Sequence, residues 1–389
     1  MATYDKEAAA EAETRRARRD AAARAASKVL SGPPRATMPT RLAQLAHEAE
    51  AAYQDSTPDQ YGTGPVRDLE RRTAELLGME DAAFFPTGTM AQQVALRCWA
   101  GRTGNPVVAL HPLAHPEVHE RDALHALGGL RTVHPTTAPR LPTAEEIADF
   151  EEPFGTLMLE LPLRDAGFVL PSWEELTAAV AAARERDAVV HVDGARLWEC
   201  TPHFDRPLPE IAGLADSVYV SYYKSLGGLS GAALAASADL IAEAKAWRHR
   251  YGGLLFQQYP AALAAQAGLR DELPRLASYV LHARPVAEAL RRGLLDGGLD
   301  LVRVHPPTPH THQFQLWLAH PARVLDEASV RQAERTGLSL FGRGVFTEPG
   351  PPGLSMTEVT VGASALEWTA DEVHEAAEAY AALVAEVLE

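Results

Sequence analysis

The chain has only four lysines, and one of them stands where an amine could act as a nucleophile. Lys224 follows an apolar run and precedes a glycine-rich turn in SVYVSYYKSLGGLSGAAL (217–234). Burial disfavours the charged ammonium form and lowers its pKa, which is what an amine that attacks an aldehyde requires. A lysine that extends from a strand end to solvent has the same pattern, so this segment alone leaves both interpretations open.

A carboxyl group closes a second apolar run. Asp193 ends the strand-like VVHVD in VVHVDGARLWE (189–199), and the carboxyl ends of strands are where open α/β sheets bind ligands. Such an acid could hold a metal, bind a ribose, pair with a protonated ring nitrogen, or be purely structural. The three residues that follow, Gly194, Ala195 and Arg196, offer no further metal ligand.

A third segment has the pattern of an anion cradle. In FFPTGTMAQQ (84–93) an apolar strand leads to Thr87, Gly88 and Thr89 and then to a helix-forming stretch. Backbone amides at a helix start, with a glycine that permits close approach, bind phosphate well. An ordinary strand-to-helix turn shows the same pattern.

Taken together, the three segments supply the parts that pyridoxal phosphate (PLP) needs. These parts are a Schiff-base lysine, an acid opposite the pyridinium nitrogen and a phosphate cradle. Lys224 follows Asp193 by 31 residues, which leaves room for one helix and one strand between neighbouring strand ends. The sequence therefore predicts a PLP site anchored on Lys224.

The elements that must position these residues alternate between short apolar runs and amphipathic helices. Several runs are apolar on both faces, as in a sheet covered by helices on each side, so we expect an α/β fold with a mostly parallel sheet. The expected strands are 82–85, 107–110, 156–161, 188–192, 217–222 and 232–236. Capping-box patterns that predict helix starts pair Ser172 with Glu175, Thr143 with Glu146, and Thr369 with Glu372.

Changes in composition predict three parts. Residues 1–45 form an N-terminal arm and linker, with a charged helix or mobile arm, a proline-broken stretch and a helix that resumes near Arg41. Residues 46–275 form the large PLP-binding domain. Residues 276–389 form a smaller α+β domain with helices near 284–295 and 371–388 and strands at 301–305 and 312–318.

The charge balance limits the possible partners. With 52 acidic and 36 basic residues the net charge is −16, which argues against broad binding to nucleic acid or to an anionic membrane. We expect a cytoplasmic protein, because there is no signal-peptide pattern and no apolar run of membrane-spanning length. The two cysteines, Cys98 and Cys200, predict neither a disulfide framework nor a structural zinc site.

Three quoted stretches resemble a known family. YGTGPVRDLERRTAELLGMEDAAFFPTGTMAQQVAL (61–96), HVDGAR (191–196) and SYYKSLGGLSGAAL (221–234) are similar to the threonine aldolase and β-eliminating lyase group of fold-type-I PLP enzymes. The resemblance covers about residues 46–270. It implies a fold-type-I large domain with a smaller C-terminal domain. It also implies active sites built at a subunit interface, in a homodimer or homotetramer.

The resemblance also assigns roles, residue by residue. Lys224 would hold the cofactor covalently and Asp193 would pair with its pyridine nitrogen. His115, in LHPLAHPEVHE, matches the histidine that stacks on the ring. The remaining assigned residues are Gly88 and Thr89 at the phosphate, Arg196 near the ring hydroxyl, Ser221 in the cofactor site, and Tyr61 near the neighbouring subunit's site.

The sequence departs from the family where substrate is chosen. Ser31, in SKVLSGPPRATMPT, could replace the family's opening Ser-Asp-Thr. The Asn-Thr-His segment is replaced by a loop that contains Arg164 and Asp165, and GGLLFQQ (252–258) lacks the family's arginine. No arginine stands in LSMTEVTVG (354–362), so Arg164 or Arg343 could hold the substrate carboxylate. The chain therefore resembles a divergent branch of this group.

Other histidines are weighed separately. His111, His115 and His119 lie four residues apart, but Pro112 and Pro116 interrupt a helix there, so we predict no metal site. His312, in the smaller domain, could approach the substrate or could simply pack.

The resemblance implies aldol cleavage of β-hydroxy-α-amino acids of the L-threonine or L-allo-threonine type, giving glycine and an aldehyde. Lys224, Asp193 and His115 would be the catalytic residues, with His115 or a water that it holds as the base. Transaldol transfer or β-elimination on a related amino acid is the alternative. A non-catalytic protein that binds a nucleotide or sugar phosphate is the contrasting possibility.

Overall fold

The computed structural model describes residues 2–32 and 36–389, with side chains described from Glu13 onward. The chain divides into two compact units, Thr37–Ala277 and a second that joins Met1–Ala36 to Ser278–Glu389. No helix among the described residues is long and apolar enough to cross a membrane.

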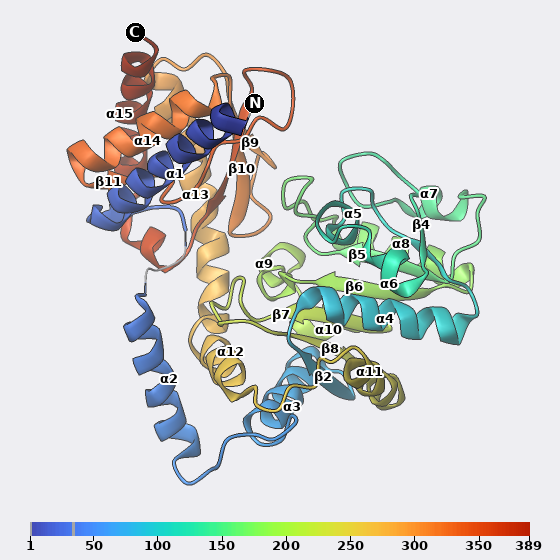
Figure 1. The fold of residues 1–389 in the computed structure, drawn as a ribbon. Helices are drawn as coiled ribbons and strands as arrows, with labels where there is room; N and C mark the ends of the chain where they lie inside the picture. The colour runs from blue at the N-terminus through green and yellow to red at the C-terminus, as the bar shows by residue number, and fades with distance from the viewer. Residues whose placement is uncertain (1, 33–35) are drawn as a thin grey trace. The chain divides into compact units, whose positions relative to one another are not determined.

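A seven-stranded sheet forms the centre of the Thr37–Ala277 unit (Figure 1). Its order is β2-β8-β7-β6-β5-β3-β4, and the strands from β7 to β4 in this order run parallel to one another. The strands are β2 (Asp81–Phe85), β3 (Val107–Ala109), β4 (Arg131–Val133), β5 (Thr156–Glu160), β6 (Val189–Gly194), β7 (Ser217–Ser221) and β8 (Ala232–Ala236). The α/β prediction is confirmed. The expected strands match β2, β3 and β5–β8 within two residues at each end, whereas β4 was not expected.

Strand β8 runs antiparallel to both of its neighbours. A connection of ten residues, which includes Lys224, joins β7 to β8, and so short a link between adjacent strands favours the antiparallel arrangement. Since β2 is antiparallel to β8, it points the same way as β7. The carboxyl ends of β2, β3, β5, β6 and β7 therefore lie at one edge of the sheet.

Helices cover both faces of this sheet. On β2, Ala83 and Phe85 pack with residues of α4 and α11, while the amide of the alternate residue Phe84 donates a hydrogen bond to Glu70 of α3. The helices of this unit are α2 (Met38–Tyr53), α3 (Pro65–Leu77), α4 (Gly88–Thr103), α5 (His115–His119), α6 (Ala123–Gly128), α7 (Ala144–Ala148), α8 (Trp173–Glu185), α9 (Thr201–Phe204), α10 (Leu208–Ala212), α11 (Ala238–Arg250) and α12 (Tyr259–Asp271).

The helix starts follow local capping chemistry. The Ser172–Glu175, Thr143–Glu146 and Thr369–Glu372 pairs all form complete capping boxes, as predicted. Helix α2 begins at Met38 rather than near Arg41, because Thr37 caps it and Pro39 occupies its first turn, a position that proline tolerates.

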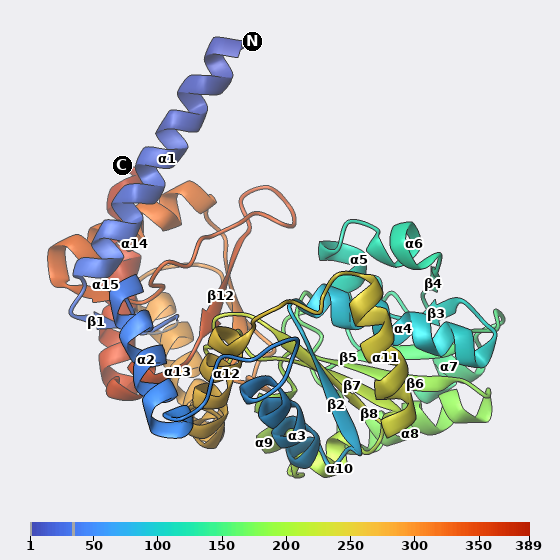
Figure 2. The ribbon, with the colours of Figure 1, turned by 60° about the horizontal axis from the view of Figure 1, so that its bottom comes forward.

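The second unit has its own sheet and core. Strands β12 (Ser355–Thr360), β10 (Gln313–Leu318) and β9 (Val302–His305) form an antiparallel sheet, and β1 (Lys28–Val29) pairs with β11 (Leu338–Ser339) in parallel. Its helices are α1 (Ala2–Ala25), α13 (Leu276–Asp296), α14 (Ala322–Thr336) and α15 (Ala370–Leu388). Helix α1 packs along α14 through Arg18, which pairs with Glu327 and Glu334, and its first half extends beyond the rest of its unit (Figure 2).

Candidate active site

The polar residues of the large sheet gather at its carboxyl edge. Asp193 and Glu160 are the penultimate and last residues of β6 and β5, and they face each other in register. Lys224 follows β7, His115 follows β3, and Gly88 follows β2. This edge is where doubly wound sheets place their ligands.

Lys224 lies in the turn between β7 and β8 and is half-buried. Gly227 closes the turn by donating its amide to the Lys224 carbonyl at 3.1 Å, with a φ of +67° that favours glycine. Burial lowers the pKa of the Lys224 amine and the Arg196 cation lowers it further, while the Asp193 and Glu160 carboxyls oppose the shift. The amine is thus biased toward its neutral, nucleophilic form.

Asp193 is buried in the same electrostatic environment. Its Oδ1 accepts a hydrogen bond from the Ala195 amide at 3.1 Å, which fixes the carboxyl at the strand end. Burial raises the pKa of Asp193, whereas the charges of Lys224 and His115 favour its ionised form. A bound cation opposite this carboxylate, such as a protonated ring nitrogen, would therefore be stabilised.

Glu160 is a site residue that the sequence interpretation missed. Its two carboxyl oxygens accept from two different backbone amides, that of His115 at 2.8 Å and that of Arg164 at 3.3 Å. Burial raises its pKa to about 8, with the Asp193 charge as the next cause. The signal was present, because Glu160 closes a fully buried apolar strand in the same way as Asp193 does.

His115 begins helix α5 and is oriented by a second unpredicted acid. Its Nδ1 lies 3.2 Å from an oxygen of Glu120, whose side chain is almost entirely buried. This carboxylate is the largest cause of a raised pKa at His115, with burial opposing and Asp193 adding to the rise. The position of Glu120, five residues after His115, gave no periodic signal on so short a helix.

The predicted anion cradle is the start of a real helix. Thr87 caps α4 by accepting from the Met90 amide at 3.2 Å, and Gly88 and Thr89 form the first turn. The first amides of a helix have no partner within it. Gly88 must be glycine, because a Cβ there would overlap the hydroxyl of Tyr219.

Two more predicted residues lie beside Lys224 in the chain or in the fold. The Ser221 hydroxyl, at the end of β7, is fully buried, and no residue that the structure describes hydrogen-bonds to it. The Arg196 guanidinium stacks over Phe168 at 5.4 Å, and its charge acts on Lys224.

Arg164 belongs to a small polar cluster with Asp165 and His119. Its Nη1 lies 3.6 Å from an Asp165 oxygen and 3.4 Å from Nε2 of His119. The charge of Arg164 also acts on Lys224, so this cluster borders the lysine.

The other predicted substrate residues are placed as follows. Tyr61 is exposed, and its ring meets the edge of Phe256 at 5.4 Å. Ser31 and His312 belong to the second unit, where both are buried. There Ser31 Oγ accepts from the Thr360 amide at 3.0 Å, and His312 Nδ1 donates to the Val361 carbonyl at 2.6 Å. Their roles in substrate binding stay predictions.

The structure corrects one premise about the histidine series. Pro116 does not interrupt α5 but occupies its first turn, so His115 and His119 share one helix face. His111 lies before this helix, where its ring contacts the Ala138 carbonyl at 2.6 Å. Among the residues that the structure describes, no group of three or more His, Cys, Asp or Glu side chains could hold a metal ion.

These residues fit PLP. The edge offers an amine biased toward its neutral form, a buried acid and a buried hydroxyl without a protein partner. It also offers the start of helix α4, where Gly88 leaves no room for a side chain. The fold and the site together define a fold-type-I PLP enzyme.

Comparisons with known proteins specify the family. Residues 34–306 match the model of the β-eliminating lyase family. The low-specificity L-threonine aldolase of Escherichia coli K12 is 33% identical over 252 residues, covering 63% of this chain and 74% of that protein. A "putative L-allo-threonine aldolase" from Listeria monocytogenes EGD-E superposes with a TM-score of 0.85 at 32% identity, covering 95% of this chain and 99% of that one.

A third relative gives the same result. A "putative aromatic amino acid beta-eliminating lyase/threonine aldolase" from Exiguobacterium sp. 255-15 is 35% identical with a TM-score of 0.84, covering 94% of this chain and 99% of that one. The chain belongs to the threonine aldolase and β-eliminating lyase family. It is a PLP-dependent carbon–carbon lyase of the threonine aldolase type.

Proposed function

We propose that this protein cleaves β-hydroxy-α-amino acids of the L-threonine or L-allo-threonine type into glycine and an aldehyde. One observation carries the proposal: Lys224, Asp193 and His115 act on one another electrostatically at one edge of the sheet. The names of the relatives support the same substrate class.

The proposed roles follow from each residue's surroundings. When bound, PLP supplies an electron sink for the pair released from the bond that breaks. Lys224 binds it covalently, and Asp193 pairs with its ring nitrogen. The remaining cofactor residues are Gly88 and Thr89 at the phosphate, Ser221 as a hydroxyl partner, Arg196 at the ring hydroxyl side, and His115 on the ring face.

Arg164 is our choice for the substrate carboxylate. It borders the Lys224 site, and its backbone amide is fixed by Glu160, which also fixes His115. Arg343, the other sequence candidate, is an exposed residue of the second unit.

We also propose a homodimer or homotetramer with shared active sites, in which Tyr61 faces the neighbouring subunit's site. Light scattering coupled to size-exclusion chromatography measures the assembly, and a monomer at micromolar concentration would contradict this part of the proposal.

The central experiment is a screen of L-threonine, L-allo-threonine and phenylserine with added PLP, in which aldehyde release and the cofactor's visible spectrum are both recorded. Lys224→Ala should lose both signals. Lys245→Ala is the matched control, because Lys245 pairs with Asp81 at 3.1 Å away from the site and should retain both.

The screen also separates the alternatives. No aldehyde from any of the three substrates with wild-type protein would overturn the proposal. Glycine transferred to an added acceptor aldehyde would indicate transaldol transfer, and release of ammonia with a keto acid would indicate β-elimination. A protein that gains no visible absorbance with PLP would favour a non-catalytic binding role.

A further inference from the structure

His119 lies beside the proposed site, and none of the roles proposed above belongs to it. It ends α5 four residues after His115, on the same helix face, and the two ring centroids are 5.2 Å apart. Its side chain is 37% exposed and that of His115 is 31% exposed, so solvent reaches both rings.

Asp165 determines which nitrogen of His119 is available. His119 Nε2 lies 2.7 Å from Asp165 Oδ2, whereas the donor Nη1 of Arg164 is farther from the same nitrogen, at 3.4 Å. Since an ionised carboxylate only accepts, the shorter contact places the proton on Nε2. Nδ1 is then left with a lone pair. No described residue hydrogen-bonds to that atom. A histidine held by a carboxylate in this way is the usual arrangement of a general base.

The pair borders the reacting lysine. Arg164, adjacent to Asp165 in the chain, acts electrostatically on Lys224. Glu160 accepts from the amides of both His115 and Arg164, so one carboxyl joins the two segments that carry His119 and Asp165.

His115 is the less suitable of the two histidines for accepting a proton. Its Nδ1 is bound to Glu120, and the raised pKa that results favours the protonated ring, which donates rather than accepts. The ring of His119 has no such bond at Nδ1.

We propose that His119 is the catalytic base that takes the proton from the substrate's β-hydroxyl, with Asp165 as its positioning residue. The inference rests on the proposed aldol cleavage. The hydroxyl proton moves to Nδ1, the O–H pair becomes the second bond of the aldehyde carbonyl, and the Cα–Cβ bond breaks. The pair from that bond stays with Cα, and one proton returned to Cα completes glycine.

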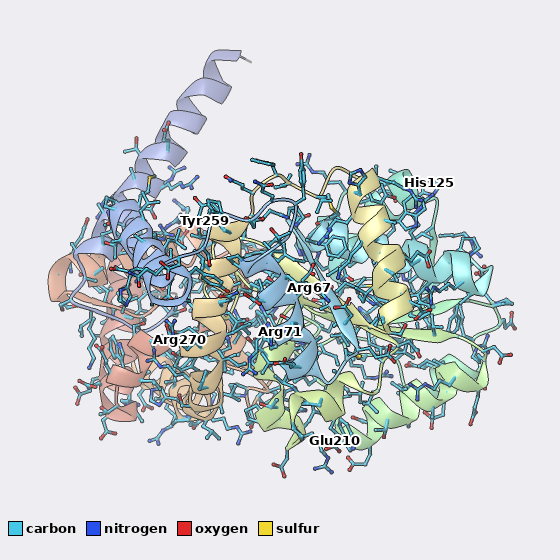
Figure 3. All side chains as sticks on the ribbon, turned by 90° about the horizontal axis from the view of Figure 1, so that it is seen from below. Arg67, Arg71, His125, Glu210, Tyr259 and Arg270 are labelled. Carbon is cyan, nitrogen blue, oxygen red and sulfur yellow. The ribbon has the colours of Figure 1, made fainter. Side chains whose placement is uncertain are left out.

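His119→Gln tests the proposal in PLP-loaded protein. We expect kcat/KM for cleavage to fall by about 100-fold or more, mainly in kcat, which is the usual contribution of a general base. Exchange of the glycine α-hydrogen with deuterated solvent, followed by NMR, should stay within about threefold of wild type, because glycine has no β-hydroxyl. His125→Gln is the matched control, since His125 is exposed on α6 at the molecular surface (Figure 3).

Asp165 is tested by the split between kcat and KM. The groups that face His119 are Asp165, Arg164 and His115. Asp165→Asn removes the carboxylate that accepts from His119 Nε2, so kcat for cleavage should fall about tenfold while KM stays within about threefold of wild type. Asp165→Glu should restore most of the lost kcat.

The possible outcomes of these experiments distinguish failure of the His119 inference from failure of the proposed function. Cleavage by His119→Gln within threefold of wild type would overturn the inference, as would an equal loss of cleavage and of glycine exchange. An unchanged kcat in Asp165→Asn, or no rescue of kcat by Asp165→Glu, would overturn the role of Asp165. If wild-type protein releases no aldehyde while it still exchanges glycine, the proposed function itself fails.

Discussion

Two histidines of the same unit, His191 and His115, show how differently the centre and the edge of the sheet are built. His191, in the middle of β6, is fully buried, and its ring is bound by Gln92 at 2.5 Å and by Ser217 at 2.7 Å. Burial without a charged partner lowers its pKa to about 3. His115, at the edge, is bound by Glu120, which raises its pKa.

The difference indicates that the centre of the sheet contributes mainly to stability, whereas its carboxyl edge contributes mainly to reactivity. The His191 chain continues to Trp99, whose indole donates to Ser217 at 2.7 Å, and it joins α4, β6 and β7 through neutral hydrogen bonds. The edge instead contains the buried acids Glu160 and Asp193 and the Arg196 cation. Substitutions in the centre should therefore cost stability, whereas those at the edge should cost activity.

Asp193→Asn should give the largest effect. The amide keeps the acceptor for the Ala195 amide but loses the charge opposite the ring nitrogen, so we expect kcat/KM to fall about 1,000-fold, or about 4 kcal/mol. Thermal unfolding of the cofactor-free protein should show an unchanged or higher Tm, because a buried charge is removed. A large fall in Tm together with full specific activity would show that Asp193 contributes to stability rather than to activity.

His191→Ala should act in the opposite sense. It creates a cavity and leaves Gln92 and Ser217 without their partner, so the free energy of unfolding should fall by about 3 kcal/mol in urea titrations. Activity per folded molecule should stay within about threefold of wild type. His249→Ala, on the exposed face of α11, is the matched control and should change neither quantity.

Glu160→Gln tests the edge of the sheet through the pH dependence of protein stability. Because the folded-state pKa is about 8 and the usual value is 4.5, folding takes up a proton between these values, so wild-type stability falls as pH rises through that window. Gln cannot ionise. The stability of the variant relative to wild type should therefore increase by roughly 4 kcal/mol from pH 4.5 to 9. A pH-independent difference in urea titrations would contradict this prediction.

Glu120→Gln should have the smallest effect. A histidine whose pKa is raised on folding adds stability that is fully present below its unfolded pKa of 6.5 and is lost as pH rises through the folded value. The variant should be less stable by about 1 kcal/mol at pH 6, with the deficit shrinking toward pH 9, since His115 is partly exposed. An equal deficit at both pH values in urea titrations would show that His115 is not charged in the folded protein.

The sequence was most informative where a residue type contradicted its surroundings. Lys224 and Asp193 are charged residues that end apolar strands, and the structure places both at one edge. Glu160 has the same signal, because it is an acid inside the expected apolar strand 156–161. Glu120 could not be found, because its partner depends on the path of a five-residue helix.

The strands show a similar limit. Strands β5–β8 are fully or almost fully buried, and their apolar runs predicted them. Strand β4 has three residues and only one of them is buried, which leaves little apolar signal. In β12 the buried residues alternate with half-buried ones, a period of two, but two of the buried positions hold Ser355 and Thr357, so the apolar signal is weak.

The scarcity of lysine gives the molecule a simple amine chemistry. Of the lysines whose side chains are described, Lys28 pairs with Glu372 at 2.7 Å and Lys245 with Asp81 at 3.1 Å, so both side chains are engaged with a carboxylate. Lys224 alone among them has an amine biased toward neutrality. Among these three described lysines, an aldehyde should therefore react first with Lys224, and borohydride reduction followed by peptide mass mapping would locate the resulting mass increment on that residue.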